Sequence, residues 1–219
     1  MVADGTTMTA SSLDWLLRHS RDRKDPDIRA LACILIHRCS RADAPHRRAL
    51  GLDPQEVRTL MLRYFRPAVL DGPEEVCVRR HVLGLDPASE ECCGATVADH
   101  AEYGRFSASL LEQEEQDLCR LFLNHASGTG LWPVVFARLI ARACMEPEHL
   151  WMSLGLENRG QLTGILERHF SALAAKNDRD MRWKKFFYKL LCDIEKVWTC
   201  TASSCEICPH HPECYAPEL

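Results

Sequence analysis

The stretch LWPVVFARLIARACM, residues 131–145, decides the fold, because it has the most apolar helical pattern in the chain. Its apolar side chains, among them Val135 and Leu139, recur at the three- and four-residue spacing of one helical face. Arg138 and Arg142 interrupt the run, so it is too short and too charged to cross a membrane. The pattern therefore predicts a helix at the centre of a soluble core.

Further helical patterns lie on both sides of this stretch, at residues 27–39, 55–65, 106–126, 162–170 and 180–198. No segment sustains the two-residue alternation of a strand. We therefore expect an all-α fold, a bundle-like domain of six to eight helices followed by an irregular, Cys-rich tail. Leu-Gly-Leu followed by a helix occurs at residues 50–65 and again at residues 154–170. This repetition suggests an internal helix–turn–helix duplication, although a common way of starting a helix would look the same.

The composition divides the chain into three regions. Residues 1–26 are expected to be a flexible N-terminal segment with a short helix, residues 27–199 a helical domain, and residues 200–219 the Cys-rich tail. Inside the helical domain, residues 86–104 combine proline, glycine and acidic side chains, which predicts a mobile loop.

Composition also excludes several functional classes. A hydrophobic fraction of 46% over 219 residues is enough to build a core, and a formal net charge of −4 argues against a general nucleic-acid binder. Residues 1–12 lack the basic and apolar regions of a signal peptide. We expect a cytoplasmic protein with neither a membrane nor a nucleic acid as partner. In a reducing compartment, twelve cysteines indicate metal binding more often than disulfides.

The tail CTASSCEICPHHPEC, residues 200–214, reads C-x4-C-x2-C-x5-C. Its thiols are the candidate metal ligands: Cys200, Cys205, Cys208 and Cys214. The first three follow the spacing of plant-type iron–sulfur proteins. A structural zinc site made of four thiolates, or of three thiolates and one imidazole, fits the same residues. Oxidised disulfide pairs are a weaker third interpretation, because nothing else in the chain is typical of a secreted protein.

Other cysteine and histidine residues could be metal ligands, but structural or surface roles explain them better. Cys192 is expected to be a helix residue, His210 and His211 polar loop residues, and His149 a core or surface residue rather than a ligand. No Ser-His-Asp order, glycine-rich phosphate loop or H-E-x-x-H motif is present, so we expect a protein that is not an enzyme.

Two segments of the chain resemble a known protein family. RWKKFFYKLLC at residues 182–192, followed by the four-cysteine spacing, and ARLIARACMEPEHLWMSLGL at residues 137–156 resemble the NifQ family of nitrogen-fixation proteins. The resemblance extends from about residue 112 to residue 214. The spacing alone indicates only a four-thiol metal site, and the alternative function is that of a helical adaptor with a structural zinc tail.

The resemblance implies an iron–sulfur and molybdenum protein. Such a protein processes molybdenum and donates it for biosynthesis of the nitrogenase iron–molybdenum cofactor, with a cluster of the 3Fe-4S or 4Fe-4S type on the four tail cysteines. The implied partners are molybdate, the nitrogenase cofactor assembly scaffold and, as a further candidate, the nitrogenase iron protein. The helix before the tail has basic residues that could meet an acidic partner or molybdate, or simply be solvated, namely Arg182, Lys184, Lys185, Lys189 and Lys196.

Overall fold

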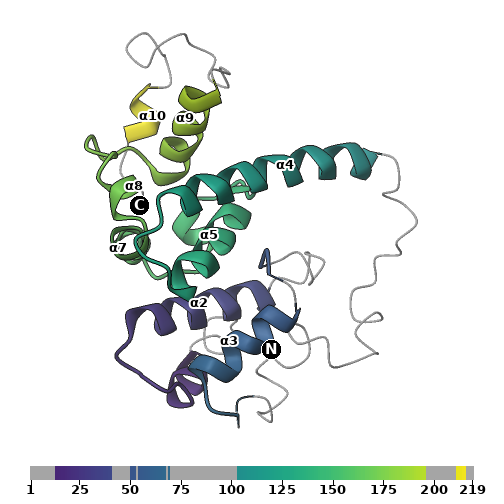
Figure 1. Cartoon of the computed structure of the whole chain (residues 1–219), viewed down its shortest axis with the longest axis vertical. Coiled ribbons are helices and arrows are strands. Elements are labelled where there is room, and N and C mark those ends of the chain that lie inside the picture. The colour runs from purple at the N-terminus through teal and green to yellow at the C-terminus, as the bar shows by residue number, and fades with distance from the viewer. Residues whose placement is uncertain are drawn as a thin grey trace, which may run out of the picture. The chain divides into compact units, whose positions relative to one another are not determined.

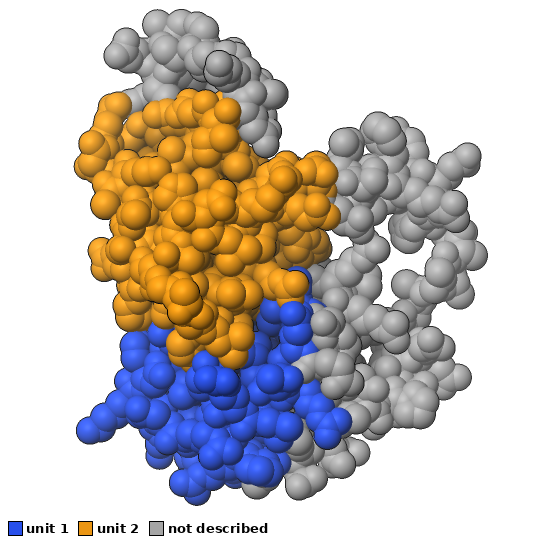
Figure 2. Space-filling view, viewed as in Figure 1, with its two compact units in different colours: residues 1–105, 154–156 blue, residues 106–153, 157–219 orange. Residues whose placement is uncertain are grey.

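The structure is a computed structural model that describes residues 13–40, 50–52, 54–67, 69, 103–195 and 211–215. The regular elements in these ranges are helices, accompanied by an isolated antiparallel bridge between Ser20 and Phe65. The predicted all-α class is therefore confirmed. None of the helices in the described ranges is long and apolar enough to cross a membrane. Figure 2 shows the two compact units of the chain, residues 1–105 with 154–156 and residues 106–153 with 157–219.

Unit 1 is built on helices α2 (Pro26–Ser40) and α3 (Pro54–Tyr64), with residues 13–18 forming a short helix as expected. The Asp25 carboxylate accepts a hydrogen bond from the Asp27 amide at 2.8 Å and so caps the first turn of α2. The end of α3 is joined to the residues after the short helix, because the Arg21 amide donates to the Tyr64 carbonyl at 2.8 Å. Both long helices begin within one residue of their predicted positions.

Unit 2 contains the remaining helices, apart from the first three residues of α4. Figure 1 shows them in order: α4 (Tyr103–Asn124), α5 (Leu131–Cys144), α6 (Leu150–Ser153), α7 (Arg159–His169), α8 (Ser171–Ala174), α9 (Trp183–Glu195) and α10 (His211–Tyr215). Most side chains of α5 are buried, including Phe136, Leu139 and Ile140, so this helix forms the core of unit 2 as its sequence predicts. Val134 is the exposed residue of this helix, at 43% exposure.

Aromatic side chains hold α9 in place within unit 2. The Phe122 ring of α4 packs 5.2 Å from Phe170, which lies between α7 and α8, and 4.8 Å from Phe187 of α9. Phe187 also stacks on Trp183 at 5.8 Å. Because all three phenylalanines are fully buried, the helix that leads into the cysteine tail is fixed to the core.

The described residues contain ten helices, more than the six to eight expected, but the number of long helices lies within that range. Among the described residues, six helices have eleven residues or more, namely α2, α3, α4, α5, α7 and α9. The others are short, with four to six residues each. α10 belongs to the tail that was predicted to be irregular, whereas residues 200–210 and 216–219 of that tail lie outside the described ranges. Of the predicted mobile loop at 86–104, only Tyr103 and Gly104 are described, and both belong to α4.

The two Leu-Gly-Leu segments share more than their sequence. Gly51 and Gly155 both have a left-handed backbone, with φ of 66° and 67°, and the leucines on either side of each are buried. Each segment is followed by an eleven-residue helix, α3 or α7, which ends just before the buried Phe65 or Phe170. The duplication itself stays a prediction.

Candidate metal centre

Of the four predicted ligands, Cys214 is the one that the structure describes. Cys200, Cys205 and Cys208 lie outside the described residues, as do His210 and the side chain of His211. Within the described ranges, no group of three or more His, Cys, Asp or Glu residues is placed to hold a metal ion. The four-thiolate site therefore stays a prediction, and the described geometry concerns how its last ligand and the preceding helix are held.

Cys214 lies in α10, where its side chain is half-buried and not part of a disulfide. Its carbonyl oxygen accepts a hydrogen bond of 2.9 Å from the Arg182 amide, at the start of α9. The Arg179 guanidinium carbon lies 5.0 Å from the centre of the neighbouring Tyr215 ring. Figure 1 shows α10 beside α9 as a result. The motif thus begins after the C-terminal end of α9 and returns to its N-terminal end.

The loop between α8 and α9 is closed by side chains. The Asn177 side chain donates to the Met181 carbonyl and accepts from the Met181 amide, both at 2.8 Å. Arg159 of α7 donates to the same carbonyl at 3.1 Å and forms an ion pair of 2.8 Å with Asp180. Asp180 has a φ of 54°, the left-handed conformation that aspartate and asparagine tolerate best among residues other than glycine.

α9 is also held through polar contacts with α5 and α7. The Lys184 ammonium donates to the carbonyls of Glu146 and, at 2.7 Å, Glu148, just after the C-terminal end of α5. The Trp183 indole donates to the Thr163 hydroxyl of α7 at 3.0 Å. Lys184 is therefore directed into unit 2, whereas Lys185 and Lys189 of the predicted basic face are exposed. The helical pattern of the sequence does not reveal this difference, because all three lysines look alike in it.

The remaining candidate ligands do not gather around a metal site in the described ranges. Burial raises the pKa of the Cys144 thiol to about 12, so this cysteine keeps its proton at neutral pH. Cys192 is half-buried in α9, and His149 is half-buried just before α6. The ordinary roles expected for Cys192 and His149 stay predictions.

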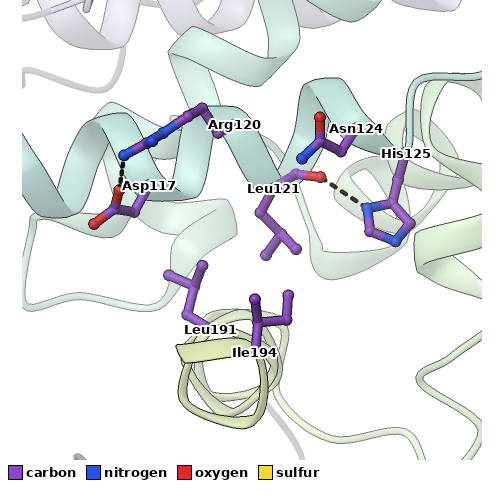
Figure 3. A pocket seen from close by; sticks show the side chains of 7 residues that line it. All are labelled: Asp117, Arg120, Leu121, Asn124, His125, Leu191 and Ile194. Atoms are coloured by element: carbon purple, nitrogen blue, oxygen red, sulfur yellow. Dashed lines mark hydrogen bonds and ion pairs between the residues drawn. The ribbon is translucent and has the colours of Figure 1, made fainter. Parts of the chain in front are cut away.

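A pocket of about 200 Å³ lies between the C-terminal halves of α4 and α9 (Figure 3). Leu121 of α4 faces Leu191 and Ile194 of α9 across it, and the other lining residues are Asp117, Arg120, Asn124 and His125. Arg120 is paired with Asp117. No sequence signal indicates this pocket, because its two walls come from helices that are far apart in the chain.

The described part of the motif offers one donor that suits a metal. Cys214 has a half-accessible thiol, and a thiolate is a soft donor. Iron–sulfur clusters and zinc both accept such a donor, so Cys214 alone does not distinguish the two.

The chain is similar to known proteins over most of its length. Residues 30–216 match the sequence model of the NifQ family. The chain is 31% identical to the protein NifQ of Azotobacter vinelandii over 205 residues, which cover 94% of this chain and 88% of the relative. It is 32% identical to a NifQ homolog of Sinorhizobium fredii over 194 residues, 87% of this chain and 72% of that one.

A third relative, the protein NifQ of Klebsiella pneumoniae, is 26% identical over 183 residues, which cover 83% of this chain and 93% of the relative. No solved structure matches the chain. Because the family pattern and the aligned relatives each span most of the sequence, the chain belongs to the NifQ family, and this membership supports a role in nitrogen fixation.

Proposed function

We propose that the protein carries an iron–sulfur cluster on Cys200, Cys205, Cys208 and Cys214 and uses it to process and donate molybdenum for biosynthesis of the nitrogenase iron–molybdenum cofactor. The observation that carries this proposal is the C-x4-C-x2-C-x5-C spacing at residues 200–214 of a NifQ-family chain. The chain's own part is to supply soft thiolates and to hold them near one another. When bound, the cluster supplies sulfide donors, which suit molybdenum.

A carrier role fits the residues better than catalysis. The four cysteines are ligands rather than acids or bases, and no motif of a known catalytic site accompanies them. The proposed compartment is the cytoplasm, because reducing conditions keep such thiols available for metal. Molybdenum is in this scheme the cargo, which arrives as molybdate and leaves toward the cofactor assembly scaffold.

The ligand set is tested by replacing each of the four cysteines singly with alanine and purifying the variants without oxygen. Each change is expected to lower bound iron and acid-labile sulfide sharply. Cys119→Ala and Cys192→Ala are the matched controls, since both residues are half-buried helix cysteines outside the motif. Full iron content in any motif variant removes that cysteine from the ligand set. A colourless wild-type protein that holds one zinc ion supports the structural zinc tail instead.

The proposed partner is the nitrogenase cofactor assembly scaffold, with the nitrogenase iron protein as a second acceptor. Lys185 and Lys189 are exposed on α9, directly before the tail, where they could attract an acidic surface. Lys184 is excluded from this surface, because its ammonium is bonded within unit 2.

Transfer is tested with the molybdenum-loaded protein and the scaffold, either mixed or separated by a dialysis membrane. Contact is expected to be required, and equal cofactor formation in both arrangements would refute direct transfer. Lys185→Glu combined with Lys189→Glu is expected to slow transfer while iron content stays at the wild-type level. Arg23→Glu with Lys24→Glu is the matched control, because it makes the same charge change at two exposed residues of unit 1.

A further inference from the structure

We infer that Asn177 is a positioning residue for Cys214. Its side chain closes the loop between α8 and α9 by hydrogen bonds, and the residue after this loop binds the backbone of Cys214. This inference rests on the proposed function only where it treats Cys214 as a metal ligand. The placement of Cys214 itself is a property of the chain and can be tested separately.

Side-chain hydrogen bonds hold the loop between α8 and α9 closed. Asn177 makes two hydrogen bonds of 2.8 Å to the backbone of Met181, one in each direction, and so closes residues 177–181 into a compact loop. Arg159 bonds the same Met181 carbonyl and pairs with Asp180, which fastens the loop to α7. The left-handed backbone of Asp180 is unfavourable for most residues, and the surrounding bonds keep it in place.

The loop between α8 and α9 contacts α10, which contains Cys214, in two places. Arg182, the next residue after the locked loop, donates its amide to the Cys214 carbonyl at 2.9 Å. Arg179, inside the loop, lies over the Tyr215 ring at 5.0 Å. An isolated helix of the five residues of α10 has no stability of its own in water, so contacts with the rest of the protein must determine its position.

The position of Cys214 matters for the affinity of the proposed metal site. A metal site keeps its affinity only when neighbouring groups hold its ligands in a narrow range of positions. The backbone of Cys214 is held by the Arg182 amide, and the direction of that amide depends on the loop that Asn177 closes. Asn177 therefore acts on the metal centre through Cys214 without touching the metal.

The test is Asn177→Ala in the full chain, purified without oxygen. Hydrogen exchange of the Arg182 amide and of the α10 amides is expected to rise by about fivefold or more, which corresponds to one net hydrogen bond. Iron loss to a chelator is expected to be faster by a similar factor, at a temperature where the far-ultraviolet circular dichroism is unchanged. Asn124→Ala is the matched control, because Asn124 is an exposed asparagine of unit 2 outside the loop.

A second variant keeps the test decisive if Asn177→Ala fails to fold. Arg179→Gln removes the cation over Tyr215 but leaves the loop bonds intact, and about a twofold rise in α10 exchange is expected. Unchanged α10 exchange in the variants, or an equal rise throughout α5 and α7, would overturn the inference. Faster exchange with unchanged iron loss would overturn the role toward the metal. A wild-type protein without iron would refute the proposed function, and the exchange rates would still decide the placement of Cys214.

Discussion

The packing of Gly155 against His37 of α2 leaves no room for a side chain at position 155. Its backbone φ is 67°, and a β-carbon added there would lie 2.1 Å from the β-carbon of His37 in α2. A contact this short is impossible between non-bonded carbons, so any larger residue must displace both the backbone and His37.

Gly155→Ala is therefore expected to lower the free energy of unfolding by about 2 kcal/mol or more, from strain at a positive φ together with the clash. Thermal unfolding measures the effect. Gly164→Ala is the control: it lies inside α7, and its β-carbon would meet only the end of the flexible Arg168 side chain, at 3.0 Å. The control is expected to be neutral or stabilising, because alanine favours helix. Equal losses in both variants would contradict the role of His37.

Cys144 predicts a specific response to alkaline pH. Burial raises the pKa of its thiol to about 12, from 9.0 in the unfolded chain. The folded protein thus holds the proton more tightly, so this contribution to stability is complete below pH 9 and is lost as the pH rises from 9 toward 12. Urea unfolding of the wild type is expected to lose about 1 kcal/mol from this group between pH 8 and pH 10.

Cys144→Ala is the variant that isolates this contribution, since alanine has no proton to lose. Its stability is expected to fall less steeply with pH than that of the wild type, even if its stability at pH 8 is lower because of the cavity. Identical slopes for the two proteins would show that the buried thiol does not contribute.

At the scale of elements, α9 is more than an amphipathic helix. Its apolar face is buried through Phe186 and Phe187, as periodicity predicts. Lys184, however, reaches back to carbonyls after the end of α5, where a cation is favourable because the helix dipole is negative. This lysine adds a polar link between α9 and the segment after α5 to the aromatic packing that already holds α9.

Lys184→Met is expected to cost about 1 to 3 kcal/mol, because it leaves the carbonyls of Glu146 and Glu148 without the ammonium. Lys185→Met changes the adjacent, exposed lysine in the same way and is expected to shift stability by no more than about 0.5 kcal/mol. Chemical unfolding of the two variants side by side gives the comparison. A neutral Lys184→Met would return this residue to the solvated basic face.

At the scale of the whole molecule, each unit has an apolar core of its own. Leu16, Ile34 and Met61 are fully buried in unit 1, as are Phe122, Phe136 and other large side chains in unit 2. These cores consist of helices that precede the cysteine tail, so we expect their burial not to depend on a bound metal.

Removal of the metal is therefore expected to leave most of the helical structure in place. Circular dichroism of the chelator-treated protein should retain most of the helical signal of the loaded protein, with any loss confined to the tail. Collapse of the signal, as in a zinc finger without zinc, would show that the metal organises the fold.

The sequence by itself determined the helical class, the approximate positions of the long helices and the candidate ligands, although α4, α7 and α9 each begin three residues away from the expected start. Hydrophobic spacing is a local property, and residues 131–145 carry it within a single element, so α5 was predicted to within one residue. The tail cysteines could also be identified as candidate ligands, because the spacing of cysteines within a short segment is visible in the sequence itself. The family followed from the same strings and was confirmed by the comparisons.

Only the tertiary structure decided which residues of different elements meet. It directs Lys184 inward while Lys185 remains exposed, closes Asn177 onto Met181, and brings the Arg182 amide to the Cys214 carbonyl. The same holds for the pocket between α4 and α9. Periodicity tells which face of a helix is buried but not which partner covers it, because that choice depends on how all the helices pack at once.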